Sequence, residues 1–372
     1  MKQLLQALFI AGLALSTTMG LAALAADPAP EALIDAGHWK QARAAIEQRY
    51  QANPNDAQAA YLLSRVKLAF GDLDNALKLA EKAVELDGIK AAYHYQLGVV
   101  CGETAERASL FSKAGWARRF KSEAEKAASL DPHDLDARFG LLEYDLEAPR
   151  LMGGGRDKAQ AMAAEIAKID AARGNLAEAR LAQQDKDTAA KQESWYLKAL
   201  TAAPHNYEVL VDLAQFYGPD GRKQFDLAEK YAEQARKLEP GRVDAYAMLA
   251  YSDAARGRWP ELERDLKAAE KNVPDDLSPY YQAGRALFER GDNPDPAGAP
   301  SVLTRAESCF RKYLTQEPEG EAPTLAHAHW RLGLVLEKEG HKPEAIAELE
   351  TALRLKPDLD AAKKDLKRLN GG

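Results

Sequence analysis

Apolar and polar residues along this chain follow the spacing of amphipathic helices, with apolar residues recurring about every three or four positions. The clearest stretch runs from Leu332 to Pro357, where apolar residues on both sides of Gly340 predict two helices joined by a turn. The small residues Gly333 and Ala345 fall where these helices would cross, and Pro357 would end the second helix. The stretch therefore predicts one helical hairpin.

This hairpin pattern is repeated along most of the chain. Small residues recur upstream at equivalent positions about every thirty-four residues, as in Ser64 with Ala76 and Ala214 with Ala228. The spacing resembles that of the tetratricopeptide repeat (TPR) family, whose repeats are pairs of antiparallel helices. The resemblance implies an all-α, right-handed α-solenoid of about eight to nine hairpins with a C-terminal capping helix. We place the repeats near residues 30–56, 57–90, 91–134, 135–172, 173–206, 207–242, 243–276, 277–320 and 326–359, with the cap at 360–372.

Three turns are longer than the repeat requires, near residues 102–114, 147–156 and 291–301. In the first, we expect the second helix of the hairpin to be extended. Because the first two interrupt equivalent turns, we expect them to emerge on the same edge of the solenoid. The glycine run at 153–155 does not predict a phosphate-binding loop, since no strand precedes it and the GxxxxGK[ST] spacing is absent. The sequence does not predict what these turns do.

The N-terminal residues 1–26 have the composition of a secretory signal. A lone Lys2 precedes an apolar run, and small residues at Ala23 and Ala25 predict cleavage near Ala25/Ala26. The alternative is an uncleaved membrane anchor. We expect a mature solenoid at 27–372, located in the periplasm or secreted, with no transmembrane segment after signal cleavage.

Composition and charge narrow the possible partners. The chain is 46% apolar and 29% charged, with a formal net charge of −7, which argues against general nucleic-acid binding. The two cysteines, Cys101 and Cys309, lie about five hairpins apart, too far for a disulfide, so we expect both to be unlinked. We expect no cofactor, metal site or catalytic site, since the seven histidines are scattered and no catalytic motif occurs.

The resemblance implies that the first helices of the repeats line an inner groove that grips extended peptides. We placed candidate contact residues by repeat register, favouring aromatic and arginine side chains because these are the usual anchors of interfaces. The alternative is that several of them only pack between adjacent first helices. The candidates are Tyr61, Arg65, Tyr95, Gln96, Phe139, Glu143, Asp212, Gln215, Tyr251, Tyr281, Arg285, Trp330 and Arg331.

We expect a non-catalytic scaffold or assembly factor of the cell envelope that binds protein or peptide clients through this groove. Its ends carry aromatics beside arginine, whereas acidic residues occupy the middle, which predicts a client with a basic or polar centre. The alternative is an accessory subunit of a periplasmic transport or wall-remodelling system that binds a small ligand or glycan. The client, the pathway and the oligomeric state are not predicted by the sequence. The acidic residues of the middle are Asp136, Glu143, Glu208, Asp212 and Asp244.

Overall fold

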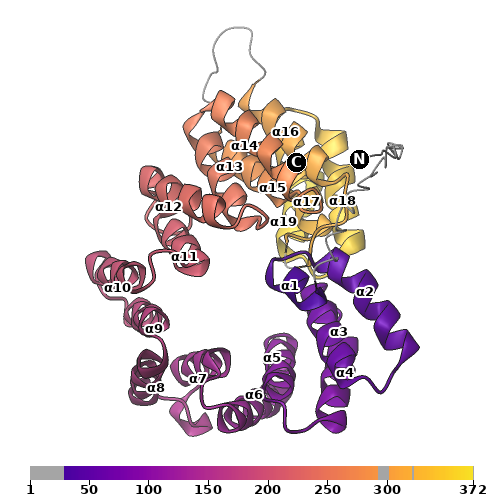
Figure 1. The fold of residues 1–372 in the computed structure, drawn as a ribbon. Helices are drawn as coiled ribbons and strands as arrows, with labels where there is room; N and C mark the ends of the chain where they lie inside the picture. The colour runs from indigo at the N-terminus through magenta and orange to yellow at the C-terminus, as the bar shows by residue number, and fades with distance from the viewer. Residues whose placement is uncertain (1–28, 292–300, 321, 372) are drawn as a thin grey trace, which may run out of the picture.

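The computed structural model describes residues 29–291, 301–320 and 322–371. These residues form nineteen α-helices and one short 3-10 helix, with no strand among them. The predicted all-α solenoid is confirmed, since consecutive helices pair as hairpins and successive hairpins stack side by side (Figure 1). The predicted signal at 1–26 lies outside the described residues, as does most of the predicted turn at 291–301.

In the described residues nine pairs of helices follow one another as hairpins, and a last helix covers the end. The first helices of the hairpins are α1 (Pro30–Asp35), α3 (Ala57–Ala69), α5 (Ala91–Arg107), α7 (Leu135–Glu147), α9 (Ala171–Gln184), α11 (Tyr207–Tyr217), α13 (Asp244–Arg256), α15 (Ser278–Arg290) and α17 (Leu325–Lys338). The second helices are α2 (Trp39–Ala52), α4 (Leu73–Leu86), α6 (Leu110–Leu130), α8 (Arg156–Ile169), α10 (Ala189–Ala202), α12 (Phe225–Leu238), α14 (Trp259–Asn272), α16 (Val302–Tyr313) and α18 (Lys342–Leu355). The final helix is α19 (Asp360–Gly371).

Local sequence explains where several helices begin and how closely they cross. Asp56 and Asp134 cap α3 and α7, each accepting a hydrogen bond from a backbone N–H three residues ahead. At the α17–α18 crossing a Cβ on Gly333 would lie 3.1 Å from the Ala345 carbonyl oxygen, so the absence of a side chain allows this approach. At Gly174 the two neighbouring helices approach more closely still, because a Cβ there would lie 2.5 Å from the Ala167 Cα.

The extra residues near 102–114 lengthen both helices of their hairpin rather than only the second. α5 continues to Arg107 and α6 begins at Leu110, so only two residues connect them. The segment is rich in Ala, Glu, Arg and Lys, which favour helix, and it contains no proline. The expected inserted turn is therefore a longer hairpin.

The segment near 147–156 is a compact turn that contains the 3-10 helix η1 (Arg150–Met152). Gly153 has a φ of +90°, a conformation that favours glycine, and a Cβ on Gly154 would clash with the Ala148 carbonyl. The turn is held to its neighbours because the Tyr144 hydroxyl donates to the Met152 carbonyl at 2.8 Å and the Lys121 ammonium donates to the Gly153 carbonyl at 3.3 Å.

The stacked hairpins curve into a ring whose two ends touch (Figure 1). Helix α2, near the start of the described chain, lies beside the α14–α15 and α16–α17 turns, where hydrogen bonds join residues 234 to 279 positions apart. Helices α5, α7, α9 and α11 lie nearer the middle of the ring than α6, α8, α10 and α12. The first helices therefore supply the inner face, and the two ends of the row of hairpins are neighbours.

Both cysteines are buried in the helical packing and neither forms a disulfide, as predicted. Burial raises the pKa of the Cys101 thiol to about 11 and that of Cys309 to about 12, so both are protonated near neutral pH. They act as small apolar residues of the packing between hairpins.

Candidate peptide-binding face

Four of the side chains that line the inner face share one position in their helices. Tyr61 is the fifth residue of α3, Tyr95 the fifth of α5, Met248 the fifth of α13 and Gln282 the fifth of α15. All four line a hollow between first helices. A shared position in equivalent helices points side chains in equivalent directions, so the repeat itself builds this lining.

The first hollow, which we call the α3–α5 hollow, has a volume of about 440 Å³. It brings together four predicted site residues, Tyr61, Arg65, Tyr95 and Gln96. Arg65 lies over the Tyr61 ring at 5.9 Å and its guanidinium donates to Asp35 at 3.0 Å. The hollow therefore combines aromatic faces with a fixed cation. Its remaining lining residues are Asp35, Trp39, Leu68, Ala69, Ala92, Val99, Asp134 and Asp136.

Gln96 contributes less free polar surface than expected. Its side chain is only 7% exposed, and its amide donates to the Ser64 hydroxyl at 3.2 Å. The Ser64 hydroxyl in turn donates to the Ala76 carbonyl at 2.8 Å. Gln96 therefore mainly joins α5 to the preceding hairpin.

The second hollow, which we call the α11–α15 hollow, has a volume of about 300 Å³. It brings together the predicted residues Gln215, Tyr251 and Arg285. Arg285 donates two hydrogen bonds to Asp220, at 2.9 and 2.8 Å, and lies 4.9 Å over the Tyr251 ring. The two hollows thus repeat one arrangement, in which an arginine is held by an aspartate above a tyrosine ring.

Tyr281 does not lie in either hollow, so the prediction that it lines the groove is wrong. It is 7% exposed, and its ring packs edge-on against Phe310 and tilted against Tyr313 in the core. Tyr281 is the fourth residue of α15, one position before the lining residue Gln282. On a helix one residue is a rotation of about 100°, which turns the side chain from the groove to the core.

The other candidates are placed between neighbouring helices. The Trp330 indole donates to Asp365 of α19 at 2.9 Å, and Arg331 lies over the same indole at 4.6 Å. Phe139 is half-buried beneath the Arg173 guanidinium, 5.0 Å away. These three side chains line neither hollow.

Polar contacts link several first helices to the next repeat along the ring, between residues 30 to 38 positions apart, which is about one repeat. They neutralise most acidic residues that the sequence places in the middle of the groove. The sequence signals such a contact where a charged residue is followed about one repeat later by a residue of opposite charge. The contacts are Arg65 with Asp35, Arg173 with Asp136, Arg180 with Glu143, Arg242 with Glu208, Tyr251 with Glu289, Trp330 with Asp365 and Arg368 with Glu337.

Asp212 on α11 differs from these paired acids. No hydrogen bond or ion pair joins it to another residue in the described part of the chain, and it is half-buried. Burial, together with the negative charge of Glu208, raises the pKa of Asp212 to about 6. Its negative charge is therefore poorly compensated by the protein itself.

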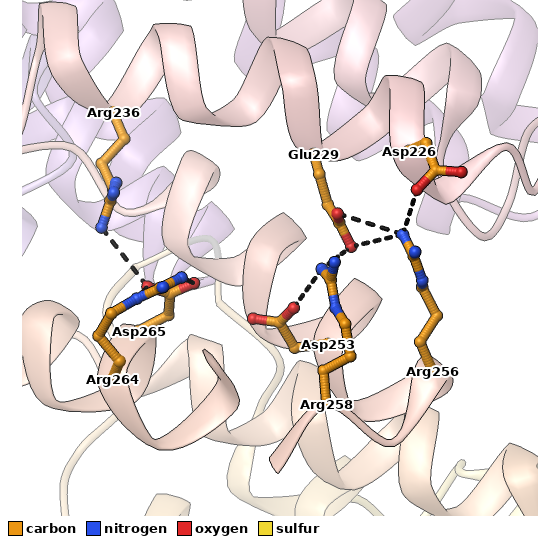
Figure 2. Close-up of polar contacts among 8 residues, drawn as sticks. All are labelled: Asp226, Glu229, Arg236, Asp253, Arg256, Arg258, Arg264 and Asp265. Carbon is orange, nitrogen blue, oxygen red and sulfur yellow. Dashed lines mark hydrogen bonds and ion pairs between the residues drawn. The ribbon is translucent and has the colours of Figure 1, made fainter. Parts of the chain in front are cut away.

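A second group of acids lies between α12, α13 and α14, where carboxylates and arginines alternate (Figure 2). Asp253 and Asp265 are each 1% exposed; Arg258 donates to Asp253, and Arg264 donates to Asp265 at 3.0 and 3.1 Å. Burial raises the pKa of Asp253 to about 7, although Arg258 opposes the shift and Asp265 adds to it. None of the eight residues in Figure 2 lines either inner hollow, and their contacts join α12, α13 and α14.

Sequence reasoning missed several lining residues. Asp35 and Trp39 precede the first complete repeat, while Asp220 lies in the turn after α11 and Gln282 is one position from the residue that was chosen. Counting from the first residue of each helix would have found Gln282. The contribution of α1 and α2 could not be found this way, because it depends on how the first hairpin tilts against the second.

Comparisons with known proteins agree with this architecture. Tetratricopeptide repeat models match residues 31–92, which span α1 to α4, and residues 326–359, which span α17 and α18. The chain therefore contains tetratricopeptide repeats near both of its ends. Among curated proteins none matches its sequence.

Solved structures with a similar fold include yeast Tom70 and two TPR proteins. Yeast Tom70 is 13% identical over 91% of this chain and 86% of its own, with a TM-score of 0.48. A TPR protein from Parabacteroides merdae is 16% identical over 84% of this chain and 98% of its own, with a TM-score of 0.42. A thermophilic TPR protein from Thermus thermophilus is 21% identical over 49% of this chain and 92% of its own, with a TM-score of 0.43.

The TPR fold suggests a general role as a protein-interaction scaffold. In residues 29–291, 301–320 and 322–371, no helix is long and apolar enough to cross a membrane. Within the same residues, no three His, Cys, Asp or Glu side chains are grouped to hold a metal ion.

Proposed function

We propose that this TPR protein is a non-catalytic scaffold or assembly factor of the cell envelope that binds an extended segment of a client protein along its inner face. The observation that carries the proposal is the pair of hollows, each with an arginine held above a tyrosine ring. Tyrosine and arginine provide large contact areas and directional hydrogen bonds, and they are frequent anchors of interfaces. The N-terminal signal composition supports the envelope location.

Asp212 supports a client that carries a basic residue. The neighbouring inner-face acids are already paired with arginines, so their charges add little attraction for a cation. A lysine or arginine of the client would supply the partner that Asp212 lacks, and the half-buried position would strengthen that pair. The proposed client segment therefore has one basic residue for Asp212 and aromatic or aliphatic residues for the hollows.

A small ligand or glycan is the second candidate. The α3–α5 hollow has the volume of a small-molecule site and presents Trp39, Tyr61 and Tyr95 beside carboxylates. Sugar rings and apolar ligands both stack on such aromatic faces. A ligand of this class would occupy one hollow, whereas an extended peptide would contact both.

Selection from a random library of displayed 12-residue peptides separates these possibilities. We expect enriched peptides that contain a lysine or arginine and that lose affinity for the Asp212→Asn variant. Glycan-array binding that is lost in Trp39→Ala, with no enriched peptide, would favour the second candidate. Enriched peptides that bind Asp212→Asn and Tyr61→Ala as well as the wild type would contradict binding at the inner face.

A further inference from the structure

The two ends of the ring meet at a polar seam, made by α2 on one side and residues 273–277 and 314–320 on the other. Arg43 donates two hydrogen bonds to the Glu317 carboxylate, at 3.0 and 2.8 Å. The Lys40 ammonium donates to the carbonyls of Asp275 and Glu317, at 2.5 and 2.6 Å. The seam is therefore tied by charge-assisted bonds at several points rather than by one contact.

Buried groups take part in the same seam. The Lys40 backbone N–H donates to the Glu319 carboxylate at 3.0 Å, and Glu319 is only 2% exposed. Asp275 accepts from the Gln41 amide at 2.8 Å and lies 2.9 Å from a ring nitrogen of His38. Because these carboxylates leave water when the ends meet, each needs the partner supplied by the opposite end.

The seam also reaches the α3–α5 hollow, where Trp39 and Ala69 form part of the wall. A Cβ on Gly320 would lie 2.7 Å from the Ala69 Cβ and 3.0 Å from the Trp39 ring. Gly320, more than 240 positions from both residues, thus packs directly against this part of the wall. The α11–α15 hollow contains no seam residue.

We propose that closure of the seam completes the α3–α5 hollow, so that opening the ring dismantles this binding site and leaves the α11–α15 hollow intact. When the ends separate, Trp39 and Ala69 lose the backbone of Gly320 as their support and become free to move. If closure strengthens client binding at this hollow, the bound client stabilises the closed ring by the same free energy, since the coupling of two equilibria is reciprocal. This regulation rests on the proposed peptide-binding function, but the coupling of seam and hollow can be measured without a client.

Two variants open the seam by different means. Gly320→Leu places a side chain where Trp39 and Ala69 already lie, and Lys40→Ala with Arg43→Ala removes the charge-assisted bonds. Gly115→Leu is the matched glycine control, because Gly115 is exposed on α6, which is not part of the seam, and a Cβ there meets nothing within 4 Å. Spin labels on exposed Ala44→Cys and Ser308→Cys report the distance between the ends.

Hydroxyl-radical footprinting of the same samples measures the solvent accessibility of the aromatic side chains in each hollow separately. We expect both opening variants to lengthen the label distance and to increase oxidation of Trp39 and Tyr61 several-fold, with Tyr251 unchanged and with wild-type helical content. A separated label pair with unchanged Trp39 and Tyr61 oxidation would overturn the proposal, and so would labels that do not move in either variant.

Binding is measured with a 12-residue peptide from the library that protects Tyr61 from oxidation. We expect its affinity to fall about tenfold in the opening variants and not in Gly115→Leu. Equal affinity for open and closed rings would contradict the coupling. If no library peptide protects Tyr61 or Tyr251 in the wild type, the proposed function fails, while footprinting still decides whether the seam completes the hollow.

Discussion

Single residues without side chains set how closely neighbouring helices approach. At Gly174 an added methyl group would meet the Ala167 backbone, which cannot move as a flexible side chain could. We expect Gly174→Ala to lower the free energy of unfolding by about 1 to 3 kcal/mol, because overpacking exceeds the gain in helix propensity. Chemical denaturation measures this, with Gly241→Ala as the control in open space. Equal stability of the two variants would show that α8 and α9 adapt freely.

Asp212 illustrates a residue whose charge costs stability. Its folded pKa, about 6, lies above the ordinary 3.8, so ionisation disfavours the folded state as the pH rises between these values. We expect Asp212→Asn to be more stable than the wild type at pH 8 by on the order of 1 kcal/mol, and equally stable below about pH 4. Thermal unfolding across this pH range measures the difference. A variant that is less stable at pH 8 would mean that Asp212 has a stabilising partner.

Among the helices, α12, α13 and α14 are joined by the carboxylate–arginine cluster of Figure 2. Arg258 donates to both Glu229 of α12 and Asp253 of α13. We expect Arg258→Ala to lower the free energy of unfolding by about 2 kcal/mol, because it leaves a buried carboxyl without its donor. Arg311→Ala removes an exposed pair within one helix and should cost about 0.5 kcal/mol or less. Similar losses in the two variants would contradict a special role for the cluster.

Most of the helix pairing could be predicted from sequence because it depends on local spacing. Gly333 and Ala345 identify one crossing on their own. The lining of the groove required a more exact register, and choosing Tyr281 instead of Gln282 selected a side chain that points into the core. An aromatic side chain alone did not identify a groove residue here, because tyrosine packs equally well in the core.

At the scale of the whole molecule, ring closure could not be predicted. It results from small rotations between successive hairpins, which sum over the full chain, and sequence spacing does not report their size. The seam residues show the same difficulty. Lys40 and Glu317 lie more than 270 positions apart, so no repeat period relates them.

The seam should respond to pH. Burial raises the pKa of Glu319 to about 7 from 4.5, and the hydrogen bond with Asp275 raises that of His38 above 6.5. Both groups hold protons more tightly in the closed ring, so their support for closure is present at mildly acidic pH and is lost as the pH rises toward 8. The pKa of Asp275 falls to about 2, because hydrogen bonds from His38 and Gln41 outweigh burial, and its support is lost only below about pH 4.

We therefore expect closure to be strongest near pH 4 to 4.5, to weaken as the pH rises above the ordinary Glu319 pKa of 4.5, and to be weaker still at pH 8. The distance between spin labels at positions 44 and 308 should increase from pH 5.5 to pH 8. In Glu319→Gln, which retains a hydrogen-bonding side chain without the titrating carboxyl, the increase should be smaller. A distance that lengthens toward acidic pH would reverse the assigned roles of Glu319 and His38.

Binding at the inner face is the central claim, and isothermal titration of a library-selected peptide tests it most directly. With Tyr61→Ala and Arg65→Ala combined, we expect the dissociation constant to rise at least about thirtyfold, equivalent to roughly 2 kcal/mol, with helical content unchanged. Lys267→Ala, at an exposed position of α14, should bind like the wild type. Wild-type affinity in the Tyr61 and Arg65 variant, with the fold intact, would place the interface elsewhere on the ring.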